Sequence, residues 1–216
     1  MSQQTEPMAK AAPTWVAPFA DPGPVGLAGF AATTFFLSVV NTNMLGTSVQ
    51  SGVLGLAIFY GGIVQLLAGL WEYAKGNTFG ALAFCSYGGF WLSFWWLIDK
   101  AVPAQVGAKA PVPDVLHGVG LYLLCWAIFT AYMTVAASKT TGAVFVVFVL
   151  LTLTYIALVI GFFSESVSAF AANNDGWIRL GGWLGILTAI AAWYTSFAGV
   201  ANSTFKRTVL PVFPLG

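Results

Sequence analysis

Six runs of mostly apolar residues, each about as long as a membrane is thick, constrain the fold of this chain more than any other feature. They cover approximately residues 24–40, 52–71, 78–98, 116–137, 143–163 and 178–200. A transmembrane helix needs about 20 such residues. Lipid offers no partner for backbone N–H and C=O groups, so helices are the default for these runs. We therefore predict an all-α integral membrane protein with six transmembrane helices.

The scarcity of charge supports this assignment and excludes several other classes of protein. Only 7% of the 216 residues are charged, whereas soluble domains carry about 25%. The net charge of +1 gives no electrostatic basis for binding nucleic acid. Two cysteines and one histidine cannot supply a four-ligand zinc site. No nucleophile–base pair or metal cluster is visible, so we predict neither an enzyme nor a protein with a cofactor.

The regions outside the apolar runs define the expected organisation. Residues 1–20 are polar and rich in Pro and Ala, without the apolar core of a secretory signal, and we expect a disordered tail. Residues 21–205 would form the six-helix domain, and residues 206–216 a C-terminal tail. The longest connection, from Asp99 to Leu116, holds three prolines.

The distribution of Lys and Arg predicts the orientation in the membrane. If the N-terminus is cytoplasmic, the inner side holds five such residues and the outer side three. The inner ones are Lys10, Lys75, Lys139, Lys206 and Arg207, and the outer ones are Lys100, Lys109 and Arg179. Because cytoplasmic loops carry an excess of positive charge, we expect a multi-pass protein of the cell membrane with both termini in the cytoplasm.

Neutral polar side chains are the candidates for a solute pathway. No ionisable residue lies clearly in the middle of a run, which argues against a buried proton relay. Hydroxyl and amide groups can bind a carboxylate weakly, and weak binding suits conduction. The alternative is that they bond to their own backbone or to a neighbouring helix. The candidates are Thr33, Thr34, Asn41, Gln65, Ser86, Tyr87 and Thr152.

Three stretches of the sequence resemble one known family. Asp21-Pro22-Gly23-Pro24-Val25-Gly26-Leu27 resembles the Asn-Pro-Ala-Pro-Leu-Gly-Leu signature of the acetate uptake transporter family, which includes the bacterial succinate–acetate permease. The second stretch comprises residues 59–65, 69–73, 76–80 and 86–91, and the third is Arg207-Thr208-Val209-Leu210-Pro211. The motif positions that we single out are Asp21, Pro22, Pro24, Gly26, Leu27, Glu72, Asn77 and Thr78.

The resemblance implies six helices around a pore in each protomer, assembly as a homo-hexamer, and transport of acetate or, in some members, succinate. It also implies a hydrophobic constriction built from a Phe, a Tyr and a Leu, which fall on Phe30, Tyr87 and Leu151, with Asn41 as a polar position of the same pore. Without the resemblance, Phe30 and Leu151 would be interpreted as ordinary filling of the helices. An apolar ring of this kind can gate a pore by dewetting.

Two charged motif positions carry alternative interpretations. Asp21 replaces the family's Asn. A carboxylate there could disfavour anions or alter proton coupling, or it could simply cap a helix, since Asp and Asn are equally good caps. Glu72 ends the second run, where a charge is normally solvated.

We therefore expect a channel or proton-coupled symporter for acetate and similar small monocarboxylates. Any coupled proton would travel with the substrate as the neutral acid or through a group at a helix end. Two alternatives remain open. One is a channel for a small neutral solute such as ammonia or water, and the other is a membrane scaffold or sensor that transports nothing.

Overall fold

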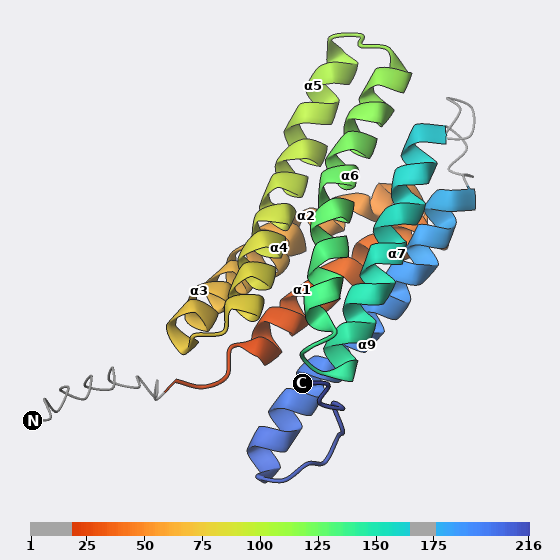
Figure 1. Ribbon diagram of the computed structural model, residues 1–216. Helices are drawn as coiled ribbons and strands as arrows, with labels where there is room; N and C mark the ends of the chain where they lie inside the picture. Colours follow the sequence, from red (N-terminus) through yellow and green to blue (C-terminus); the bar gives the residue numbers. More distant parts are fainter. Residues whose placement is uncertain (1–18, 165–175) are drawn as a thin grey trace, which may run out of the picture.

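The computed structural model describes residues 19–164 and 176–216, and their backbone is almost entirely helical. Six helical spans in these ranges are long and apolar enough to cross a membrane, which confirms the predicted fold class (Figure 1). The expected N-terminal tail lies outside the described residues except for its last two positions.

The spans are built from continuous and compound helices. Four are single helices: α1 (Gly23–Asn41), α6 (Val112–Ala137), α7 (Gly142–Ser164) and α9 (Gly176–Phe205). The second span joins η1 (Thr47–Gln50), α2 (Ser51–Ile58), η2 (Phe59–Val64) and α3 (Gln65–Lys75). The third joins α4 (Thr78–Trp96), η3 (Leu97–Ala101) and α5 (Val102–Gly107).

The third span is longer than its sequence suggests, and the expected loop from Asp99 to Leu116 is wrong. The chain stays helical to Gly107, and α6 begins at Val112. The wider π-type turn η3 comes directly before Pro103, which lies in the first turn of α5. Inside a continuous helix a proline lacks the N–H that would bond to a preceding carbonyl, and its ring crowds the preceding turn. The wider π turn lies just before Pro103, where the backbone N–H of Val102 bonds to the carbonyl of Leu97, and the chain stays helical through the proline.

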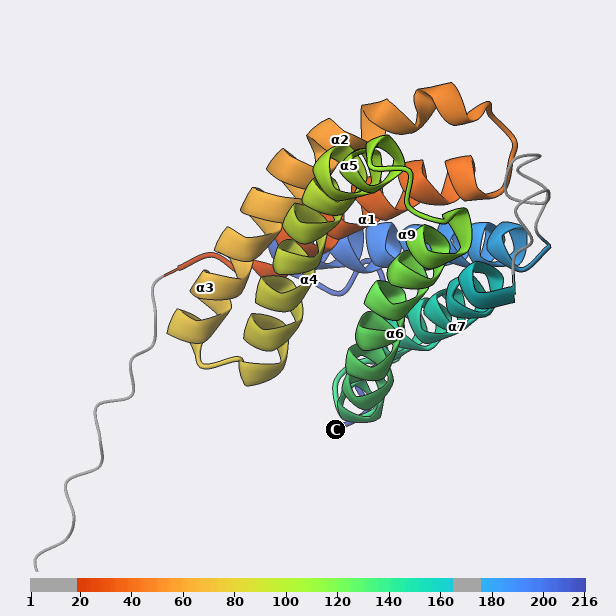
Figure 2. The ribbon, with the colours of Figure 1, turned by 90° about the horizontal axis from the view of Figure 1, so that it is seen from above.

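The helices pack in pairs around the long axis of the bundle. α1 lies along α9, α7 lies between α6 and α9, and α3 lies against α4 (Figures 1 and 2). The start of α1 and the C-terminal residues lie at the same end of the bundle, as an even number of spans requires.

Glycine allows some of these helices to approach very closely. A methyl group on Gly69 of α3 would lie 2.6 Å from the backbone nitrogen of Cys85 in α4. One on Gly182 of α9 would lie 2.6 Å from the backbone nitrogen of Thr42, just after α1. Small residues at such crossings replace the hydrophobic driving force that is missing between helices in lipid.

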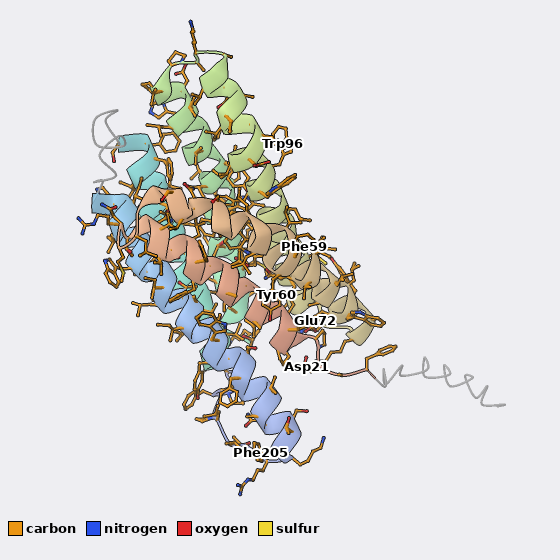
Figure 3. The ribbon with its side chains drawn as sticks, turned by 180° about the vertical axis from the view of Figure 1, so that it is seen from behind. Asp21, Phe59, Tyr60, Glu72, Trp96 and Phe205 are labelled. Atoms are coloured by element: carbon orange, nitrogen blue, oxygen red, sulfur yellow. The ribbon has the colours of Figure 1, made fainter. Side chains whose placement is uncertain are left out.

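Large apolar side chains cover the outside of the bundle. Phe59 is 66% exposed, Trp96 57% and Phe205 63% (Figure 3). Soluble monomers rarely expose contiguous apolar surface on this scale. These side chains form the apolar exterior that is expected of a bundle spanning a membrane.

Candidate functional site

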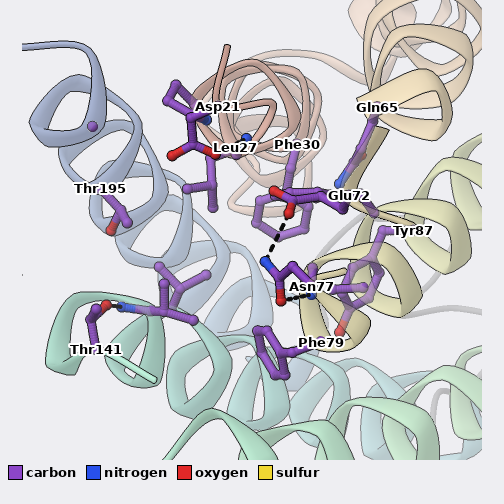
Figure 4. Close-up of a pocket in the computed structure, with 18 of the residues that line it drawn as sticks. Asp21, Leu27, Phe30, Gln65, Glu72, Asn77, Phe79, Tyr87, Thr141 and Thr195 are labelled. Carbon is purple, nitrogen blue, oxygen red and sulfur yellow. Dashed lines mark hydrogen bonds between the residues drawn. The ribbon is translucent and has the colours of Figure 1, made fainter. Parts of the chain in front are cut away.

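Two cavities follow one another inside the bundle. The large cavity, of about 320 Å³, opens at the end that carries the start of α1 and the C-terminus. Figure 4 shows Gln65 and Tyr87 on one side of this cavity and Thr141 and Thr195 on the other. The small cavity, of about 80 Å³, lies toward the opposite end and is bordered by Asn41 and Gln50.

Phe30 and Leu151 separate the two cavities. Among the described residues they alone line both, and they are only 5% and 4% exposed. Tyr87 lines the large cavity beside them, with its ring centre 5.6 Å from that of Phe30. The structure therefore brings together three residues from α1, α4 and α7 at the junction of the cavities.

The Tyr87 hydroxyl is already engaged. It lies 2.9 Å from the Thr130 hydroxyl of α6, in a fully buried position. The ring packs edge-on against Phe129, at 5.4 Å between centres, and also against Phe148, at 6.1 Å. At this junction Tyr87 therefore offers an aromatic face, while its hydroxyl joins α4 to α6.

Three buried polar atoms along the cavities have no hydrogen-bond partner in the part of the chain that the structure describes. They are Thr34 Oγ1, Gln65 Oε1 and Trp91 Nε1. Thr34 and Trp91 line the small cavity, and Gln65 lines the large one. A buried polar group without a partner costs about 1–3 kcal/mol. A polar solute or water in the cavities would supply the missing partners.

Trp91 is the member of this set that the sequence reasoning missed. It belongs to a motif stretch, but a tryptophan inside an apolar run is normally interpreted as packing. Its indole edge packs against Gly61 of η2, where a methyl group would lie 2.8 Å from Trp91 Cδ1. Neither the motif nor the apolar run around Trp91 reveals that the indole N–H is left without an acceptor.

Asp21 is paired at the mouth of the large cavity. Its Oδ1 lies 2.7 Å from Lys75 Nζ and accepts a hydrogen bond from the backbone N–H of Gly23, at 3.1 Å. The carboxylate therefore satisfies the first turn of α1, although the residue at the N-cap position is Pro22. Both functions expected of Asp21, charge at the mouth and support of the helix start, are compatible with this geometry.

Glu72 is buried at the same mouth, contrary to the interpretation of a solvated helix end. It is 2% exposed, and its Oε2 accepts a hydrogen bond from Asn77 Nδ2 at 2.8 Å. Asn77 Oδ1 in turn accepts from the backbone N–H of Gly80 at 3.1 Å and caps α4. A methyl group on Gly80 would lie 2.9 Å from Glu72 Cδ, so this glycine makes room for the carboxylate. Thr78, beside Asn77, is the first residue of α4.

The remaining motif residues join α1 to its neighbours at this end. Gly26 lies against Phe84, whose ring would be 2.8 Å from an added methyl group. The carbonyl of Pro24 accepts a hydrogen bond from Ser196 Oγ of α9 at 2.6 Å. Leu27 lines the large cavity. The motif residues thus line the open end of the large cavity and hold α1 against its neighbouring helices there.

Three candidates, Thr33, Ser86 and Thr152, line neither cavity. Thr33 donates to the carbonyl of Gly29 at 2.9 Å, the ordinary bond of a helical threonine to its own backbone. The Thr152 hydroxyl bonds to the Phe148 carbonyl at 2.9 Å.

The reason is the helical repeat. Each of the three is the immediate neighbour of a cavity-lining residue, namely Thr34, Tyr87 or Leu151. Successive residues of an α-helix point about 100° apart, since 3.6 of them make a turn. In these three pairs, one side chain faces a cavity and its neighbour lines neither.

Comparisons with known proteins agree with this architecture. The sequence profile of the GPR1/FUN34/yaaH family matches residues 2–216. The chain is 44% identical to the Ammonia transport outward protein 2 of Saccharomyces cerevisiae over 94% of this chain and 68% of that protein. It is 38% identical to the Succinate-acetate/proton symporter SatP of Escherichia coli over 89% of this chain and 95% of that one. The solved structure of the bacterial acetate channel SatP superposes with a TM-score of 0.76 at 37% identity, over 90% of this chain and 99% of that chain.

Proposed function

The chain belongs to the GPR1/FUN34/yaaH family, and on that basis we propose that it transports acetate and related small carboxylates across a membrane through its two cavities. This membership confirms the resemblance found in the sequence. The observation that carries the proposal is the pair of cavities in line, separated by Phe30 and Leu151. A pathway interrupted by an apolar ring suits a small solute that passes when the ring is wetted or displaced.

The unpartnered polar atoms supply weak binding on each side of the constriction. We propose that the Thr34 hydroxyl and the Trp91 indole N–H donate to a carboxylate in the small cavity, and that Gln65 Oε1 accepts a hydrogen bond from the O–H of the protonated acid in the large cavity. None of these groups is charged. The two donors can hold an anion without trapping it, because they donate hydrogen bonds but place no full positive charge beside it.

The Asp21–Lys75 pair bears on whether a carboxylate at the position of the family's Asn disfavours anions. An isolated carboxylate at the mouth would repel an approaching anion, but Lys75 lies 2.7 Å away. The pair contributes little net charge to the entrance. We therefore propose that Asp21 preserves the helix start without closing the entrance to carboxylates.

Proton coupling is proposed to involve either the substrate or Glu72. Of the carboxyl groups that the structure describes, Glu72 is the one that is buried, and it borders the large cavity. A proton could therefore cross as acetic acid, or visit this side chain at the helix end. A symporter takes up acetate against its gradient when the outside is acidic, whereas a channel only equilibrates it.

We also propose a homo-hexamer in the cell membrane, with both termini in the cytoplasm. The apolar outer surface, with Phe59 and Trp96 exposed, supports contacts with lipid or neighbouring protomers. Native mass spectrometry in a mild detergent tests the number of subunits. Protease access to each terminus in sealed cells tests the orientation. The division into an N-terminal tail, the helical domain and a C-terminal tail also stays a prediction.

Uptake into proteoliposomes tests the transport function directly. We expect radiolabelled acetate to enter vesicles containing the protein faster than protein-free vesicles at acidic external pH. Excess unlabelled succinate or acetate should compete. Equal entry into both kinds of vesicle would exclude the proposal.

Ammonia conduction is the second candidate, because one relative with 44% identity is named as an ammonia transporter. The same vesicles, loaded with a pH-sensitive dye and exposed to ammonium, test it. Rapid alkalinisation without any acetate uptake would favour ammonia. The third possibility, a membrane protein without transport, requires that neither solute moves.

A further inference from the structure

The C-terminal tail, residues 206–216, folds back onto α9 and is held there by two side chains. Asn202 Oδ1 accepts hydrogen bonds from the backbone N–H groups of Val209, at 2.7 Å, and Leu210, at 3.0 Å. Asn202 Nδ2 donates to the carbonyl of Leu210 at 2.8 Å. The Tyr194 hydroxyl donates to the carbonyl of Pro211 at 2.7 Å. One amide and one phenol thus fix three consecutive residues of the tail.

Beyond this point the tail crosses to the start of α7. The backbone N–H of Gly142 donates to the carbonyl of Phe213 at 2.6 Å, and that of Ala143 donates to the carbonyl of Val212 at 3.2 Å. The backbone N–H of Leu215 donates to the carbonyl of Thr140 at 3.0 Å. The first N–H groups of a helix have no partner within it. The tail therefore caps α7 with its own backbone.

The conformation of Phe213 shows how closely the tail is fitted to α7. Its φ is +56°, in the left-handed region, which is uncommon for residues other than glycine. This turn accompanies the two neighbouring carbonyls, of Val212 and Phe213, that accept from α7. A residue in such a conformation persists only where the surrounding contacts hold it.

The held segment borders the large cavity. Val212 lines it together with Thr141 at the start of α7 and Gly199 of α9. It is half-buried, although the residues beside it in the tail, Pro211 and Phe213, are exposed. One wall of the cavity, at the end where it opens, is therefore made by the tail and not by a transmembrane helix.

We propose that the C-terminal tail forms part of the entrance to the large cavity, with Val212 as its wall and Asn202 and Tyr194 as positioning residues that hold it in place. Releasing the tail would widen the entrance and expose the cavity to larger molecules. The cavity is the one on which the proposed function rests, but chemical access to it can be measured whether or not the chain transports acetate.

Thiol labelling of a cysteine inside the cavity measures this access. The native cysteines, Cys85 and Cys125, are first replaced by alanine, and Thr195→Cys then provides a reporter in the cavity wall. The protein is placed in nanodiscs and treated with a charged methanethiosulfonate reagent. We expect Asn202→Ala to raise the labelling rate about fivefold or more, since one net hydrogen bond shifts a closed–open equilibrium by about that factor.

Further variants separate release of the tail from loss of the fold. Tyr194→Phe should raise the rate by a smaller factor than Asn202→Ala. Val212→Ala should raise it without disturbing either positioning residue. Thr208→Ala, in the same tail but outside the hydrogen bonds and the cavity wall, is the matched control and should leave the rate unchanged. A second reporter, Gln50→Cys in the small cavity, should react at the same rate in all variants.

Two results would overturn the proposal. One is an unchanged rate at the Thr195→Cys reporter in both Asn202→Ala and Val212→Ala, with both proteins eluting from gel filtration as the parent does. The other is an equal acceleration at the Gln50→Cys reporter, because that would indicate general loosening of the bundle. If the chain moves no acetate but the reporter behaves as expected, only the proposed transport function fails.

Discussion

The constriction between the cavities gives the sharpest prediction. Phe30→Ala removes the ring that lies between the two cavities and leaves Leu151 as the remaining residue that borders both. The large and small cavities should then become continuous. We expect larger carboxylates to pass more easily, while the helices keep their arrangement.

The magnitude follows from the surroundings of the ring. Phe30 is 5% exposed and packs 5.6 Å, centre to centre, from Tyr87. Replacing a buried Phe by Ala costs about 3–5 kcal/mol of stability. Because this ring already borders two cavities, it has fewer contacts to lose, and we expect the lower end, about 3 kcal/mol. A pocket discriminates one methylene group by about 10-fold to 200-fold, so the preference for acetate over butyrate should fall at least about tenfold.

The assay compares uptake of labelled acetate and butyrate into proteoliposomes at equal protein content. The ratio of the two rates is the readout, because it does not depend on the fraction of active protein. Phe35→Ala is the matched control. It makes the same substitution on the same helix, but the Phe35 ring packs against Trp193, at 5.2 Å, and lines neither cavity.

The refuting result is specific. If Phe30→Ala elutes and melts as a folded protein but keeps the wild-type ratio of acetate to butyrate uptake, Phe30 does not limit the pathway. The assignment of the constriction would then be wrong. If Phe35→Ala changes the ratio as much as Phe30→Ala, the effect is general loosening and the reasoning also fails.

Three other substitutions test the packing and hydrogen bonds around this pathway. Gly69→Ala should lower the melting temperature in detergent, because its methyl group would lie 2.6 Å from the α4 backbone and overpacking costs about 1–3 kcal/mol. Gly89→Ala, where the added methyl group meets open space, is the control and should leave the melting temperature unchanged. An equal decrease in both variants would contradict the close approach of α3 and α4. Glu72→Ala should lower the melting temperature more than Glu72→Gln, because glutamine keeps an acceptor for the buried hydrogen bond from Asn77. The reverse order would show that this hydrogen bond does not stabilise the fold. Tyr87→Phe should weaken acetate uptake and cost about 1 kcal/mol, since it loses the 2.9 Å bond to Thr130 but keeps the ring; full wild-type uptake would show that this bond is dispensable.

The sequence established the class of fold because the relevant signals are local. An apolar run of about 20 residues and the need to satisfy backbone hydrogen bonds in lipid together predict a spanning helix, and all six predicted spans are present. Prolines were a less reliable guide to where a helix ends. Pro103 indicated a loop, whereas the π turn before it keeps the third span helical to Gly107.

Two kinds of signal in the sequence predicted most of the residues that we propose for the pathway. Resemblance to the family pointed to Phe30, Tyr87 and Leu151, and hydroxyl and amide chemistry pointed to Thr34 and Gln65. Composition could not separate these from Thr33, Ser86 and Thr152, which are of the same chemical kind and lie in the same helices. It also gave no sign that Trp91 would lack an acceptor or that Glu72 would be buried.

Only the packing of the helices decided those points. The sequence fixes where residues lie around their own helix, because each advances by about 100°. It does not fix how each helix is rotated against its neighbours, since that depends on contacts between residues far apart in the chain. The position of Phe30 and Leu151 between the two cavities depends on such packing, and so do the hydrogen bonds between the tail and α7. For that reason the helices could be read from the sequence, while the cavities between them could not.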